Sequence, residues 1–161
     1  MAVTIFTHAQ VLVSTSTSTD DSAALDISSF CKSVEFTRTY DIHDVTTFGQ
    51  TDRQRRAGIA EWSFNTTLLQ SFSTADALGG SGSLDALLNT LADVGQAGGT
   101  FTIFVRPKSN IAPLKGEFNP MYWGQCIMEE YSPMSGEVGD PLEMDVPFIS
   151  AGSINRSVTS S

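Results

Sequence analysis

Three segments of this chain alternate between apolar and polar side chains, and this pattern constrains the fold more than any other feature of the sequence. A period of two residues is typical of a β-strand with one buried face and one solvent-facing face. The segments span residues 34–42, 61–68 and 142–148, and only Arg38 and Thr66 interrupt their apolar phase. We therefore expect three half-buried strands. Their remaining apolar-phase positions are Val34, Phe36, Tyr40, Ile42, Trp62, Phe64, Leu68, Leu142, Met144, Val146 and Phe148.

Shorter apolar segments at residues 3–13, 25–31, 101–105 and 122–128 predict further strands. One helix is expected at residues 83–94, where leucines and a valine recur at a spacing of three and four residues. Ser83 can cap this helix, Asp85 lies in its first turn, and Gly95 can terminate it.

Many strands, one helix and glycine-rich turns favour a mainly β fold. We expect a β-sandwich or partly closed barrel with one flanking α-helix. A length of 161 residues fits a single domain, residues 1–161. Within it we expect an exposed Ser/Thr loop at 14–21, a long inter-strand loop at 44–60 and a C-terminal tail at 150–161.

The charge distribution is uneven. The chain has 18 acidic and 9 basic residues, which gives a net charge of −9. Residues 116–155 include seven acidic residues and no Lys or Arg. Such a surface repels nucleic acid and argues against a protein that reads DNA sequence.

No motif for catalysis or for metal or cofactor binding is present. His8 and His43 stand far apart, without a recognised ligand spacing. The glycine-rich segment 79–82 lacks the Lys of a phosphate loop, and a linker into the helix is the better interpretation. Glu129 and Glu130 face opposite ways on a strand, whereas Glu143 and Asp145 share a face without an aromatic platform. We therefore predict no enzymatic activity, no cofactor and no metal.

The two cysteines, Cys31 and Cys126, lack a CxxC spacing, and buried free thiols are favoured over a disulfide. The N-terminal residues do not resemble a signal peptide, and no apolar segment is long enough to span a bilayer. We expect a protein made in a cytoplasm, with no membrane segment.

The one cluster of basic residues lies in the 44–60 connection and consists of Arg53, Arg55 and Arg56. A solvated, flexible loop is one interpretation. The other is a basic loop that docks on an acidic surface of a second copy. Such head-to-tail contacts close into rings or stack into filaments.

At these positions the sequence resembles the major tail tube proteins of long-tailed bacteriophages of the siphovirus type. The resemblance covers about residues 34–70 and 118–158. It rests on the segments Val45–Gly49, Arg53–Ile59, Trp62–Asn65, Cys126–Asp140 and Leu142–Phe148, and on Gly152 and Arg156.

The resemblance implies a virion protein without enzymatic function. Subunits of this family form hexameric rings that stack into a hollow tube, with inner strands paired into one barrel and long inter-subunit loops. The implied partners are other copies of the chain and the tape measure, terminator and distal tail proteins. DNA would pass through the lumen without specific binding, after synthesis of the protein in the host cytoplasm.

From the polar phase of the alternating strands we predict that Glu143, Asp145 and Glu35 line the lumen. We also predict that the connection carrying Arg53, Arg55 and Arg56 reaches a neighbouring subunit. Two alternatives remain open: another phage tail ring protein, such as a tail terminator or baseplate hub, and a carbohydrate-binding β-sandwich that uses Trp62 or Trp123.

Overall fold

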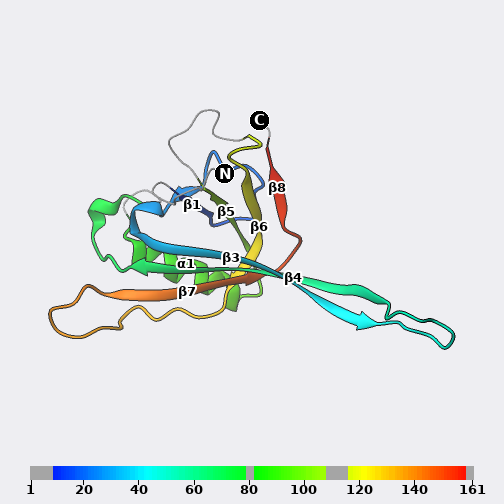
Figure 1. The fold of residues 1–161 in the computed structure, drawn as a ribbon. Helices are drawn as coiled ribbons and strands as arrows, with labels where there is room; N and C mark the ends of the chain where they lie inside the picture. Colours follow the sequence, from blue (N-terminus) through cyan, green and yellow to red (C-terminus); the bar gives the residue numbers. More distant parts are fainter. Residues whose placement is uncertain (1–8, 79–81, 108–115, 159–161) are drawn as a thin grey trace.

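The computed structural model of the chain describes residues 9–78, 82–107 and 116–158 (Figure 1). Within these ranges eight strands form one antiparallel sheet, accompanied by one α-helix and two 3-10 helices. This confirms the prediction of a mainly β fold with one helix. In chain order the elements are β1 (Gln10–Ser14), β2 (Leu25–Asp26), η1 (Ser28–Phe30), β3 (Cys31–Asp44), β4 (Arg55–Leu69), η2 (Thr74–Asp76), α1 (Leu84–Gln96), β5 (Phe101–Arg106), β6 (Met121–Met128), β7 (Glu143–Ser150) and β8 (Asn155–Ser157).

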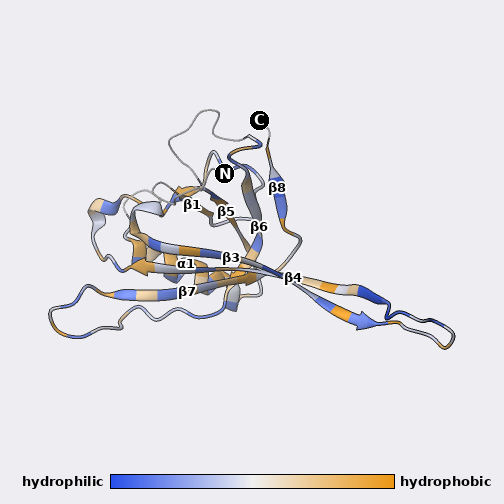
Figure 2. Ribbon diagram, viewed as in Figure 1, coloured by the Kyte–Doolittle hydropathy of each residue, from blue (hydrophilic) through white to orange (hydrophobic). Residues whose placement is uncertain are grey.

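The sheet folds back on itself. Its strand order is β2-β1-β5-β6-β7-β4-β3, and β8 pairs with β6 outside this path. Although β3 and β6 are not neighbours in this order, the rings of Phe36 on β3 and Tyr122 on β6 lie 5.2 Å apart. The half of the sheet that contains β3, β4 and β7 therefore packs on the half that contains β1, β5 and β6. The core formed by these strands also includes the four buried leucines of α1 (Figure 2).

Two of the alternating strands are buried as predicted. On β4 the buried positions are Trp62, Phe64, Thr66 and Leu68, whereas neighbouring Thr67 is only half-buried. On β7 the buried positions are Met144, Val146 and Phe148.

The helix is also confirmed, with a later end than expected. Its leucines are buried, and the Ser83 hydroxyl accepts a hydrogen bond from the Ala86 N–H. Gly95 lies inside the helix, which ends at Gln96. The glycine that stops it is Gly98, whose φ of 79° is in the left-handed region. The Gly99 N–H then bonds to the Val94 carbonyl, which closes the last turn.

The first alternating strand differs from its prediction. Val34 and Phe36 on β3 are half-buried, whereas Tyr40 and Ile42, in the same phase, are exposed. The reason is that β3 and β4 continue beyond the core as a projecting hairpin (Figure 1). We call residues 39–60 the arm; every one of them is exposed.

The loop of the arm is shorter than the expected 44–60. Arg55, Arg56 and Ala57 pair with Asp44, His43 and Ile42, so the strands are joined by residues 45–54 only. At about 3.3 Å per strand residue, the paired part of the arm extends roughly 20 Å from the body.

Other expected boundaries also shift. Ser14 ends β1 and is buried, so the exposed Ser/Thr loop begins after it. The expected C-terminal tail contains Ser150 of β7 and the whole of β8. The expected strand at 25–31 is the short β2 followed by η1. Residues 1–8 with His8, residues 79–81 and 108–115, and residues 159–161 lie outside the described residues.

Candidate functional site

The outer face of β3, β4 and β7 brings the three predicted acidic residues together. Glu35 is in register with Asn65 of β4, which is in register with Pro147 of β7. Asp145 is in register with Thr67, two residues further along β4, and Glu143 is in register with Leu69, two residues beyond that. We call the outer side of these three strands the polar face.

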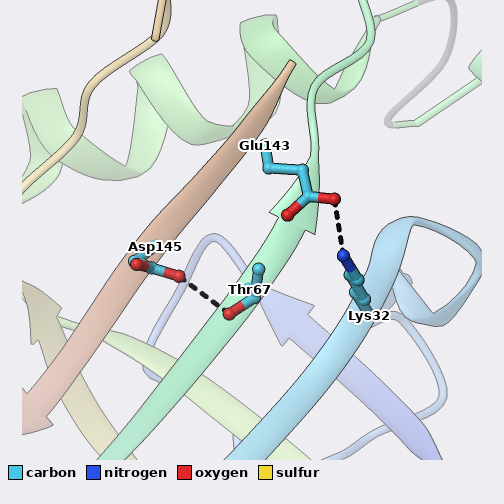
Figure 3. A network of polar contacts seen from close by, with 4 residues as sticks. All are labelled: Lys32, Thr67, Glu143 and Asp145. Atoms are coloured by element: carbon cyan, nitrogen blue, oxygen red, sulfur yellow. Dashed lines mark hydrogen bonds and ion pairs between the residues drawn. The ribbon is translucent and has the colours of Figure 1, made fainter. Parts of the chain in front are cut away.

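Two contacts order this face (Figure 3). The Lys32 ammonium lies 2.6 Å from the Glu143 carboxylate, and the Thr67 hydroxyl donates a 2.7 Å hydrogen bond to Asp145. Lys32 thus balances the charge of Glu143. Within the described residues, Glu35 and Asp145 have no Lys or Arg within ion-pair distance.

Sequence reasoning did not single out Lys32 or Glu61 for this face. Glu61 lies opposite Thr39 and adds a further carboxylate. Its polar phase in the alternation of residues 61–68 was the available signal. No sequence pattern indicates Lys32, because its contact with Glu143 joins residues 111 positions apart.

The predicted basic residues lie at the end of the arm. Arg53 is in its loop, and Arg55 and Arg56 begin β4. Successive strand residues point to opposite faces, so Arg55 and Arg56 flank the arm and do not form one patch. No ion pair involves these arginines in the part of the chain that the structure describes.

The tip of the arm is an ordered turn. The Asp44 carboxylate accepts hydrogen bonds from the Thr46 N–H and hydroxyl, which lower the pKa of Asp44. The Val45 N–H bonds to the Gln54 carbonyl at 2.9 Å, and Gly49 has a φ of 95° that a side chain would strain. The ring of Phe48, beside this glycine, is fully exposed.

A second polar cluster lies between α1 and the segment that follows β6. The Tyr131 hydroxyl donates to the Asp85 carboxylate, and the Gln70 amide donates to the Tyr131 oxygen at 3.0 Å. Burial and the neighbouring Asp85 raise the pKa of Tyr131 to about 12. This cluster ties the start of the helix to residues 70 and 131.

The tryptophans differ in accessibility. Trp62 is 5% exposed, and its indole N–H donates a 2.7 Å hydrogen bond to the Gly152 carbonyl. Trp123 is half-buried, with its ring 6.1 Å from that of Phe104. Trp62 is therefore a core residue and cannot serve as a sugar platform.

Both cysteines are free thiols, as expected, but only Cys126 is fully buried. Burial raises the pKa of the Cys126 thiol and also that of half-buried Cys31. The arm histidine, His43, is exposed. Over the described ranges, no three His, Cys, Asp or Glu side chains gather closely enough to hold a metal ion. None of the helices described here has the length and apolar character needed to cross a membrane.

The chain shares its fold with chains from gene transfer agent particles. One similar chain comes from the tail of an empty gene transfer agent particle, computed with helical refinement in C6 symmetry. It matches with a TM-score of 0.61 at 13% identity. The match covers 94% of this chain and 95% of that one.

A chain from the virion of a native gene transfer agent particle matches with a TM-score of 0.59 at 12% identity, over 92% of this chain and 94% of that one. No protein-family model and no curated protein matches the sequence. At these identities the likeness establishes a shared fold.

Proposed function

We propose that this protein is the structural subunit of a phage-like tail tube, a virion protein that assembles as stacked hexameric rings around a DNA conduit. The arm is the observation that carries this proposal. The side chains of Ile42 and Ile59 on the arm are 67% and 74% exposed. The fold that carries the arm is shared over nearly its whole length with a chain from a C6-symmetric tail. Covering each isoleucine would contribute about 1.5–3 kcal/mol, which a neighbouring subunit can supply.

The edge of the sheet supports ring formation. β3 has 14 residues and is the last strand of the sheet, so one of its sides lacks a strand partner within the described residues. A long open edge favours strand addition from another chain. Six copies in which this edge pairs with a different strand edge of the next copy would close into an inner barrel.

The polar face would then be the wall of the lumen. It carries Glu35, Glu61 and Asp145, with Glu143 balanced by Lys32. A carboxylate wall repels phosphate, so DNA would slide along it without specific binding.

The proposed partners are other copies of the chain, at the arm and at the open edge, and the tape measure, terminator and distal tail proteins at the ends of the tube. The proposal includes no enzymatic activity, cofactor, metal or membrane contact.

Electron microscopy of the purified protein tests this function. Long hollow tubes support a tail tube subunit. Single closed rings would instead favour a tail terminator or baseplate ring protein, and monomers at high concentration would contradict both.

A variant tests the role of the arm in the same assay. Changing Arg53, Arg55 and Arg56 together to Ser should abolish tubes without unfolding the chain, because these side chains are exposed and form no ion pair within the described part of the protein. Tubes that form as in the wild type would rule out the arm as an inter-subunit contact.

A further inference from the structure

A groove with acidic and apolar walls runs between α1 and the segment that follows β6. It encloses about 670 Å³. Among the described residues, its lining includes four carboxylates and no Lys, Arg or His. The exposed Phe72 and Met134 add apolar surface at the same place. The carboxylates belong to Asp85, Asp93, Glu129 and Glu130.

Within the described ranges, three of these carboxylates form no ion pair. Asp85 is engaged by Tyr131 and Gln70. The Asp93 carboxylate accepts a long 3.4 Å bond from the Asn89 amide, and the Glu130 carboxylate accepts a 3.4 Å bond from the Ser132 hydroxyl. No ion pair involves Asp93, Glu129 or Glu130 in the described part of the chain. The groove therefore fits a partner that combines positive charge with an apolar side chain.

The tip of the arm has this combination. Arg53 lies in the loop and Arg55 and Arg56 begin β4 directly after it, and the ring of Phe48 in the same loop is fully exposed. The Asp44 carboxylate and the Gln54 carbonyl accept hydrogen bonds from the Thr46 and Val45 N–H groups, which orders the turn before any contact and lowers the entropic cost of docking. The arm extends away from the body, so its tip is placed to meet another molecule (Figure 1).

We infer that the tip of the arm of one copy docks into the groove between α1 and residues 127–134 of a second copy. Arg55 and Arg56 point to opposite faces of the arm, so one of them pairs with Asp93 on the α1 wall and the other with Glu129 and Glu130 on the facing wall. Phe48 packs against Phe72 and Met134. Donor and acceptor are different surfaces, so the contact is head-to-tail and propagates from copy to copy. This inference rests on the proposed function and names the acceptor surface that the proposal leaves open.

Other acidic surfaces fit the tip less well. The polar face already contains Lys32, and its lumen side must stay open for DNA. Asp20 and Asp21 both have interactions within their own chain. Glu137 and Asp140 are exposed in a loop and do not line the groove.

Cysteine cross-linking tests the contact directly. A variant with Phe48→Cys is mixed with a second variant that carries Met134→Cys, under mild oxidation. A disulfide-linked dimer should form in the mixture. Val138→Cys is the matched control, because Val138 is also highly exposed (108%, against 80% for Met134) but does not line the groove. An equal yield with the control, or no dimer with Met134→Cys, would overturn the inference.

Charge reversal separates this inference from the proposed function. Changing Glu129 and Glu130 to Lys should raise the protein concentration needed for assembly about tenfold. Adding Arg55→Glu and Arg56→Glu to the same chain should return this concentration to the wild-type value. If the reversed groove assembles like the wild type, the docking site is wrong and the tail tube proposal stands. If the wild-type protein forms neither rings nor tubes while the cross-link forms, the proposed function fails and the contact remains.

Discussion

Gly124 faces the indole ring of Trp62, and the close approach depends on the missing side chain. A Cβ at position 124 would lie 2.5 Å from the Trp62 ring and 3.1 Å from the Ser153 carbonyl oxygen. We expect Gly124→Ala to destabilise the fold by about 1–3 kcal/mol, the usual range for overpacking. Urea unfolding measures this loss. Gly152→Ala is the control, because its Cβ would make only an ordinary 3.7 Å contact with Gln125 and should change stability little.

Tyr131 links stability to alkaline pH. Its pKa is raised from an ordinary value of 10.0 to about 12 by burial and by Asp85, so the folded protein holds this proton more tightly than the unfolded chain. The resulting stability is complete below pH 10 and is lost as pH rises toward 12. The ultraviolet absorbance of tyrosinate should show a late phase that Tyr131→Phe removes. Asp85→Asn should move this phase to lower pH, and an unchanged titration in that variant would exclude Asp85 as a cause.

At the scale of elements, two glycines near the end of α1 have opposite roles. Gly95 is inside the helix with open space where a Cβ would lie, whereas Gly98 has a φ of 79°. Gly95→Ala should stabilise the protein by about 0.5–1 kcal/mol through helix propensity. Gly98→Ala should destabilise it by about 1 kcal/mol, because an L residue is strained in the left-handed region. Thermal unfolding of both variants checks the pair, and the same sign for both would contradict the assignment of the helix end.

The sequence predicts the elements better than it predicts their surroundings. The alternation in residues 61–68 and 142–148 and the leucine spacing of α1 depend on local periodicity, and these elements form as expected. The same alternation at residues 34–42 does not reveal that Tyr40 and Ile42 leave the core. A period of two indicates a strand with unlike faces, but it cannot specify whether the apolar face is covered by its own chain. The Lys32–Glu143 pair and the groove depend on contacts between distant segments, which periodicity does not encode.

At the scale of the whole molecule, the proposed orientation of the polar face predicts how the assembled protein treats DNA. Glu35 and Asp145 lie on this face without a cationic partner in the described residues. Changing both to Lys should make the lumen attract phosphate, so that tubes retain DNA at low salt and release it as salt rises. Wild-type tubes should retain none. A filter-binding assay with short duplex DNA over a range of salt concentrations measures the difference.

The control for this experiment changes the same amount of charge elsewhere. Glu137→Lys with Asp140→Lys alters an exposed loop before β7 and leaves the polar face intact. If the polar face lines the lumen, DNA held by Glu35→Lys with Asp145→Lys lies inside the tube and resists added nuclease, whereas DNA held by the loop variant is digested. Equal digestion in the two variants would place the polar face on the outside of the tube. Rings would then have to close through another part of the sheet, because the opposite face of β3, β4 and β7 is covered by the core and cannot line a lumen.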